Sequence, residues 1–288
     1  MRKGLALIAV AIALLPGCGQ QQHRTVPVED LISALDQTRD APSQRVHMDF
    51  TMKMPGLDRK LHMNGDGAID NRTRKGRVTL DMSELAKAAG GALGPDGGRA
   101  VEIIDGTTFW MRWGPLTKQL GAGKEWVKMD LQKLGEKQGL DFNALTGVQG
   151  DPTSQLDQLR AASGDVEVVG DEKVRGVEAT HYSATIDLKR YPEVARAADR
   201  ERVRKSVDRL IQLTGQREIP TDVWVAHDSH RIVRSRTKSQ VKVPQGGKME
   251  MDITMELYDF GVRVTGTDPP PPEDVADIAD LPGAGAAP

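Results

Sequence analysis

The feature that most constrains the fold is a regular alternation of apolar and polar side chains along several segments. A period of two places successive side chains on opposite faces of a strand, so such segments predict strands with one buried face. In the segment 248–260 the apolar face carries Met249, Met251, Ile253, Met255 and Leu257. In the segment 45–53 it carries Val46, Met48, Phe50 and Met52. The pattern therefore predicts a sheet with one apolar and one polar side.

Short turns connect further strands, which favours antiparallel pairing. Asp105-Gly106 is a favoured hairpin turn, and Val174-Arg175-Gly176 separates another pair. No repeat or linker divides the main part of the chain, so we predict one α+β domain. Strands are expected at 61–69, 77–81, 101–104, 108–113, 126–129, 166–169, 178–188, 221–226 and 231–243. Helices are expected at 27–39, 83–89, 131–142, 151–164 and 192–214.

Residues 1–17 have the order of a secretory signal peptide. Arg2 and Lys3 precede an apolar run at 5–15, which is too short for a spanning helix of about 20 residues. Leu15-Pro16-Gly17-Cys18 resembles the lipobox of bacterial lipoproteins, although Ala or Ser is commoner than Pro before the Gly. We predict cleavage before Cys18 and acylation of its thiol, with palmitate or a similar chain. The alternatives are an ordinary signal peptide or a buried N-terminal helix.

These features predict four regions. Residues 1–17 form the signal peptide, 18–25 the acylated cysteine and a tether, and 26–266 the domain. Residues 267–288 form an acidic tail rich in Pro and Ala, which we expect to be disordered. The protein is expected on the extracytoplasmic side of the cell membrane, which it contacts through its acyl chains.

Composition argues against some classes of partner and cofactor. Cys18 is the only cysteine, so the domain has no internal disulfide. Removal of Arg2 and Lys3 with the signal peptide changes the formal charge from −2 to −4, which does not favour nucleic-acid binding. The six histidines show no zinc spacing, and no nucleophile elbow is present. We therefore predict no catalytic residue, metal or cofactor, and no enzyme.

Methionine is abundant and aromatic residues are scarce, with 11 Met against 4 Trp, 3 Tyr and 4 Phe. Met pairs such as Met249 and Met251 can bind Cu(I), but a hydrophobic lining explains the stripe without a metal. Flexible thioether side chains suit changing contents, such as acyl chains of varied shape. An ordinary closed core is the alternative. The residues expected to line a cavity are Met48, Phe50, Met52, Leu61, Met63, Val78, Leu80, Met249, Met251, Ile253 and Met255.

Four short motifs give the chain a resemblance to a known family. They are Glu125-Trp126-Val127-Lys128-Met129-Asp130, the segment 174–188 with Gly176-Val177 and His181-Tyr182, the segment 219–234 with Val223-Trp224-Val225, and Tyr258-Asp259-Phe260-Gly261 followed by the Pro-rich segment 269–274. Their order and spacing resemble those of the LppX/LprAFG family of actinobacterial lipoproteins, whose fold is that of the carrier LolA.

This resemblance implies a strongly curved antiparallel sheet, a half-barrel with helices on its concave face. It also implies a cavity that binds the acyl chains of a lipid or glycolipid for transport or presentation at the cell envelope. The family supplies no catalytic residues, and it does not identify the lipid, a membrane transporter or another envelope partner. The alternative function is an envelope sensor or protein-interaction module on the same fold without a ligand cavity.

Overall fold

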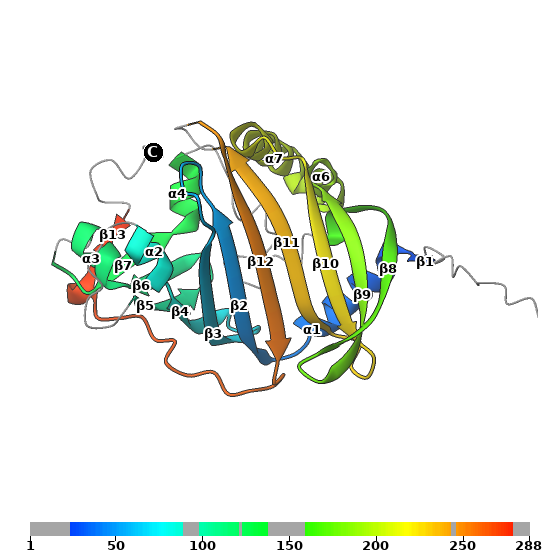
Figure 1. Ribbon diagram of the computed structural model, residues 1–288, viewed down its shortest axis with the longest axis horizontal. Coiled ribbons are helices and arrows are strands. Elements are labelled where there is room, and N and C mark those ends of the chain that lie inside the picture. The colour runs from blue at the N-terminus through cyan, green and yellow to red at the C-terminus, as the bar shows by residue number, and fades with distance from the viewer. Residues whose placement is uncertain (1–23, 89–97, 121–122, 138–158, 243–245, 279–288) are drawn as a thin grey trace, which may run out of the picture.

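The computed structural model describes residues 24–88, 98–120, 123–137, 159–242 and 246–278. Within these residues, thirteen strands form one strongly curved sheet in the order β1-β8-β9-β10-β11-β12-β2-β3-β4-β5-β6-β7-β13 (Figure 1). Neighbouring strands of this sheet pair antiparallel, except β7 and β13, which are parallel. The predicted class, an open antiparallel half-barrel with helices, is confirmed.

Most strands lie where the alternation predicts them. They are β1 (Arg24–Val26), β2 (Ser43–Lys53), β3 (Leu61–Asp70), β4 (Lys75–Asp81), β5 (Arg99–Asp105), β6 (Thr108–Arg112), β7 (Trp126–Asp130), β8 (Ala162–Val174), β9 (Val177–Asp187), β10 (Glu218–Ala226), β11 (Ile232–Lys242), β12 (Lys248–Tyr258) and β13 (Val275–Asp277). The helices are α1 (Val28–Arg39), α2 (Ser83–Ala88), α3 (Gly114–Leu120), α4 (Leu131–Lys137), α6 (Tyr191–Val194) and α7 (Arg200–Thr214), with 3-10 turns η2 (Leu188–Arg190), η3 (Ala197–Asp199) and η4 (Pro272–Asp274).

Strand pairing brings the two predicted apolar stripes onto one face of the sheet. In the β2–β12 pair, Met48 lies opposite Met255, Phe50 opposite Ile253, and Met52 opposite Met251. Residues directly opposite one another in an antiparallel pair share a face. The same registration continues into β3 and β4. All eleven residues expected to line a cavity therefore lie on one face, which we call the inner face.

Glycines allow β3 and β4 to approach closely on this face. Gly65 lies between Met48 and Leu80 in the registration, and Gly67 lies between Val46 and Val78. A Cβ at Gly65 would lie 2.4 Å from Leu80 Cδ2, which is a severe clash. The missing side chains thus leave room for Leu80 and Val78 on a tightly curved part of the sheet.

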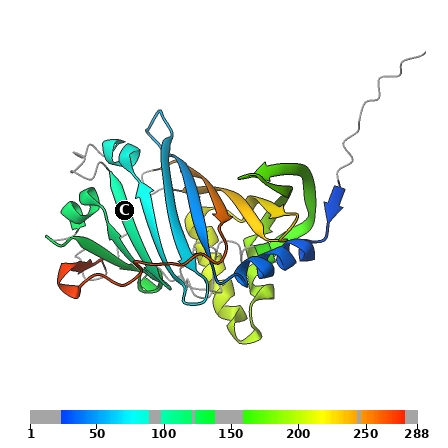
Figure 2. The same cartoon turned by 90° about the horizontal axis from the view of Figure 1, so that it is seen from below.

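Helices α1 and α7 lie within the curve of the sheet (Figure 2). Leu31 and Leu35 of α1 and Val203 and Val207 of α7 are buried in one core cluster with inner-face residues. The helices expected at 27–39 and 192–214 thus cover the concave side, as the resemblance implies. Gly215, at a φ of 71°, ends α7 in the left-handed conformation that favours glycine.

The structure corrects one predicted helix and one part of the predicted tail. The single helix expected at 192–214 is divided, because Ala195 (ψ 155°) is extended between α6 and η3. Part of the tail expected to be disordered forms β13, which extends the sheet beside β7 and carries a 3.1 Å Lys128–Asp277 ion pair. In addition, Arg24 and Thr25 belong to β1 rather than to a tether.

Other assignments differ in smaller ways. Helix α3 was not expected, and β8 begins at Ala162, inside the helix expected at 151–164. The N-terminal part of that expected helix and Cys18 lie outside the described residues.

Thr38 connects α1 to β11 and provides a test of this packing. Its buried hydroxyl donates to the Ala34 carbonyl (2.7 Å) and accepts from the Ile232 amide (2.8 Å). We expect Thr38→Val to lower the free energy of unfolding by about 1–3 kcal/mol, because it leaves a buried amide without an acceptor. Denaturant unfolding measures this loss.

Thr221→Val is a matched control. Thr221 is also buried, but its hydroxyl contacts the Ile219 carbonyl at 3.4 Å, the long limit of a hydrogen bond. Its loss should cost less than about 1 kcal/mol. Equal losses in the two variants would contradict the role of Thr38.

Candidate functional site

The inner face is buried at some positions and incompletely covered at others. Of the eleven residues expected to line a cavity, Met48, Leu61, Val78 and Met255 are buried. The other seven remain partly exposed: Phe50, Met52, Met63, Leu80, Met249, Met251 and Ile253. The structure thus places the whole set on one face, but protein atoms do not fill the space over all of it.

The partly exposed residues extend toward one end of β2 and β12. Met52 and Met251 lie opposite each other there, while Val46 and Leu257, at the other end of the same pair, are fully buried. The helices therefore close one end of the inner face more completely than the other. An apolar molecule that covered Met52 and Met251 would remove their remaining surface from water, which is favourable.

One carboxyl group lies on the inner face. Glu102 is opposite Val78 on one side and Met111 on the other, so it shares their face of the sheet. Burial raises the pKa of Glu102 from 4.5 to about 7. The side chain still has some exposed surface, and it has no ion-pair partner among the described residues.

Sequence reasoning missed Glu102. The motif Val101-Glu102-Ile103-Ile104 is apolar around the carboxylate, so it does not indicate which side chains face the core. The signal that could have found it is the registration with β4, since the predicted inner-face residue Val78 lies directly opposite.

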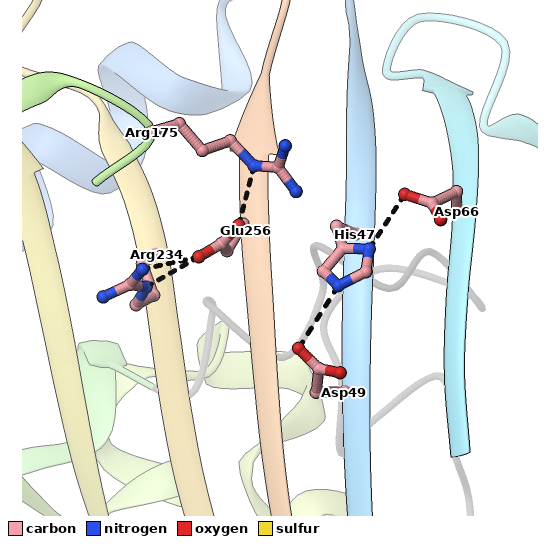
Figure 3. Close-up of polar contacts among 6 residues, drawn as sticks. All are labelled: His47, Asp49, Asp66, Arg175, Arg234 and Glu256. Carbon is pink, nitrogen blue, oxygen red and sulfur yellow. Dashed lines mark hydrogen bonds and ion pairs between the residues drawn. The ribbon is translucent and has the colours of Figure 1, made fainter.

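The outer face of the sheet, opposite the inner face, carries paired charges (Figure 3). Glu256 accepts hydrogen bonds from Arg234 (2.6 and 3.0 Å) and from Arg175 (2.7 Å). Burial would raise the pKa of Glu256, but these two guanidinium groups lower it below its ordinary value. Nearby, His47 lies between Asp66 (2.8 Å) and Asp49 (3.2 Å).

A second polar group lies on β8, β9 and β10. His181 stacks on Trp224 with ring centroids 4.1 Å apart, and its nitrogens contact Glu172 (3.0 Å) and Asp222 (3.2 Å). Among the described residues, no group of three or more His, Cys, Asp or Glu side chains is arranged to hold a metal.

A cavity of about 530 Å³ lies near the ends of β2, β11 and β12. Most of its lining residues are polar, among them Lys53, Lys60, Arg236, Lys238, Glu250 and Asp252, and the lining also includes Met251. Of the eleven residues expected to line an acyl-chain cavity, this lining includes Met251 alone. It is therefore a different space from the predicted cavity.

None of the helices in the described part of the chain is long and apolar enough to cross a membrane.

Two Streptomyces proteins are similar in sequence. A 31.2 kDa protein of Streptomyces griseus from the rplA–rplJ intergenic region is 27% identical over 207 residues, which cover 72% of this chain and 64% of that protein. The chain thus matches less than two thirds of that relative. A Streptomyces coelicolor protein named as a putative lipoprotein is 26% identical over 254 residues, which cover 78% of this chain and 74% of that protein. No family model matches the chain.

Solved structures that resemble the chain include two mycobacterial lipoproteins. LppX from Mycobacterium tuberculosis is 15% identical, with a TM-score of 0.49 over 83% of this chain and 96% of LppX. LprF from Mycobacterium bovis is 12% identical, with a TM-score of 0.42 over 83% of this chain and 94% of LprF. The chain is similar to the LppX/LprAFG lipoproteins. LppX and LprF belong to the family that the sequence motifs resemble. A LolA superfamily protein from Nitrosomonas europaea is a more distant match, at 9% identity. Its TM-score is 0.30 over 82% of this chain and 95% of that protein.

The Arg236–Asp252 pair predicts part of the pH dependence of stability. Hydrogen bonds from Arg236 (2.6 and 2.8 Å), which outweigh burial, lower the pKa of Asp252 below its ordinary 3.8. The ionised pair therefore stabilises the fold above the unfolded-state pKa, and this contribution is lost as pH falls through the lower folded-state pKa. In Arg236→Met, the loss of unfolding free energy between about pH 6 and about pH 2 should be smaller than in the wild type.

Arg45→Met is the control for this experiment, because Arg45 pairs with Asp259 at 3.3 Å where both side chains are well exposed. Exposed pairs contribute little to stability. Denaturant unfolding at a series of pH values measures both variants, and an unchanged pH profile in Arg236→Met would contradict the assignment.

Proposed function

We propose that the protein is a membrane-anchored, non-enzymatic lipoprotein that binds acyl chains of a lipid or glycolipid against its inner face. It would transport or present this lipid at the extracytoplasmic side of the cell membrane. The observation that carries the proposal is the incomplete cover of an apolar face built from Met, Phe, Leu and Ile. These residues form one surface, although they come from segments far apart in the sequence.

The energetics favour a ligand with long hydrocarbon chains. Each buried methylene contributes about 0.8 kcal/mol, so one acyl chain can bind tightly without polar recognition. Met side chains adapt to chains of different shape because they are unbranched. On the inner face of β2–β6 and β12, Glu102 is the single charged side chain among the described residues, so this surface has no pair of groups suited to acid–base catalysis.

A charge placed on the inner face tests this proposal. We expect Ile253→Lys to reduce the amount of co-purified lipid at least about tenfold, because an ammonium group would be buried against acyl chains. Lipid is extracted from the mature chain with Cys18→Ser, expressed without residues 1–17, and measured by mass spectrometry. This form carries no covalent acyl group, so the extracted lipid is bound non-covalently.

Thr254→Lys is the matched control, because Thr254 is the next residue of β12 and lies on the outer face, opposite Asp49 and Arg236. It should retain lipid at the wild-type level. If both variants retain lipid equally, the inner face is not the binding surface. A wild-type protein free of lipid, and unable to take it up, would instead favour the sensor or interaction module.

The anchor predicts a separate outcome in cells. Cys18→Ala removes the thiol that accepts the diacylglycerol, so the protein should move from the membrane fraction to the soluble exported fraction, or remain unprocessed. Cell fractionation and mass spectrometry of the mature N-terminus measure this change. Wild-type protein that begins at another residue without an acyl group would contradict the anchor.

A further inference from the structure

The less covered end of the inner face lies beside two segments that carry an excess of positive charge. One is the end of β2 with the β2–β3 connection (53–60), and the other contains the adjoining ends of β11 and β12 (236–252). Together they contain seven cationic and three anionic side chains, whereas the whole chain has a formal charge of −2. We call six of these cations the basic rim: Lys53, Arg59, Lys60, Lys238, Lys242 and Lys248.

Close contacts join these segments and the end of α7 at one end of the sheet (Figure 1). A Cβ built on Gly247, just before β12, would lie 3.0 Å from Cγ of Pro55 in the β2–β3 connection. A Cβ built on Gly215, which ends α7, would lie 2.5 Å from Cε of Lys242. The three elements therefore form one continuous surface.

The cations of the basic rim have no carboxylate partners, in contrast to cations at the opposite end of the strands. At that opposite end, Arg45 pairs with Asp259 (3.3 Å) and Lys173 pairs with Glu178 (2.9 Å). Within the described residues, no cation of the basic rim has a carboxylate within ion-pairing distance, and all six side chains are exposed. Their charge is therefore available to an external anionic group.

The three carboxylates of the same segments do not neutralise this charge. Asp252 accepts two hydrogen bonds from Arg236 (2.6 and 2.8 Å), so these two charges compensate each other. This leaves Asp58 and Glu250 against the six cations of the basic rim. The surface thus has a local positive charge on a chain that is acidic as a whole.

Apolar side chains are exposed at the same end. Met54, which follows β2, is 38% exposed, and Leu213, in the last turn of α7, is 36% exposed. Met54 lies two residues beyond Met52, at the partly exposed end of the inner face. Exposed apolar and cationic side chains together suit a bilayer surface, where apolar groups enter the acyl boundary and cations meet anionic headgroups.

We propose that the basic rim docks this end of the molecule onto a lipid bilayer with anionic headgroups, and that Met54 and Leu213 enter the bilayer surface. An acidic protein would match the charges alone, whereas a bilayer also accommodates apolar side chains from separate elements. In this orientation the less covered end of the inner face meets the membrane, so an acyl chain passes between them without crossing water. The docking is independent of bound lipid, and only this transfer rests on the proposed function.

Vesicle binding tests the docking. The mature chain with Cys18→Ser, which has no acyl anchor, is sedimented with vesicles of phosphatidylcholine or of an equimolar mixture of phosphatidylcholine and phosphatidylglycerol. The partition coefficient should be at least about tenfold higher for the anionic vesicles, because cations near an anionic surface are attracted to it. Added salt should reduce it, because salt screens exposed charges.

Two double variants that remove the same number of charges distinguish the basic rim from the net charge of the protein. Lys53→Gln with Lys242→Gln should lower the partition coefficient for anionic vesicles about tenfold. Arg45→Gln with Lys173→Gln, at the opposite end, should change it less than about twofold, because those charges lie beyond the range of the headgroups. Equal losses in the two double variants would overturn the role of the basic rim.

A fluorescent label reports which residues enter the lipid. Cys18 is the only cysteine, so in the Cys18→Ser chain Met54→Cys or Val169→Cys provides a single site for the fluorophore NBD. Val169 is 46% exposed on β8, which β9 and β10 separate from β11. On anionic vesicles, NBD emission should shift to shorter wavelength at residue 54 and stay unchanged at residue 169.

Binding without an emission shift at residue 54 would overturn the proposed orientation. An absence of binding to anionic vesicles would overturn the membrane docking in favour of an acidic protein partner. That result would leave the proposed function intact, because co-purified lipid tests it separately.

Discussion

The pairing of β2 with β12 determines which side of the sheet is apolar. These strands are separated by about 200 residues of chain, yet Met48, Phe50 and Met52 lie opposite Met255, Ile253 and Met251. A shift of one residue in this pairing would move one stripe to the outer face, where it would meet water and paired charges. The position of α1 and α7 follows from this registration, because their buried side chains pack on the face that it creates.

The outer face has the opposite character, and this difference supports the single registration. Arg234 with Glu256 and Arg236 with Asp252 pair across β11 and β12. In a slipped registration these charges would point into the core without partners, at a large cost. Apolar burial on one side and ion pairing on the other therefore select the same arrangement of strands.

The alternation of side chains was enough to predict most of this sheet and the face on which the Met residues lie. Period-two patterns depend on local geometry, which the sequence displays directly. Turns such as Arg175-Gly176, at φ values of 49° and 85°, were recognisable for the same reason. The resemblance to a lipoprotein family added the curvature, which no local pattern contains.

Features that depend on contacts between distant segments were not predictable in this way. The strand at 275–277 is defined by its pairing with β7, and the extended residue Ala195 interrupts a segment with helical spacing. Glu102 was missed because apolar residues flank it on both sides, so its orientation appears only when β4 and β5 are paired.

Native mass spectrometry of the domain tests most directly whether the inner face holds acyl chains. The sample is the mature chain with Cys18→Ser, purified without detergent and measured under native and then denaturing conditions. If the inner face holds a lipid, the native mass should exceed the polypeptide mass by the mass of that lipid, and this difference should disappear on denaturation. A native mass equal to that of the polypeptide, both as purified and after incubation with monooleoylglycerol, would contradict it.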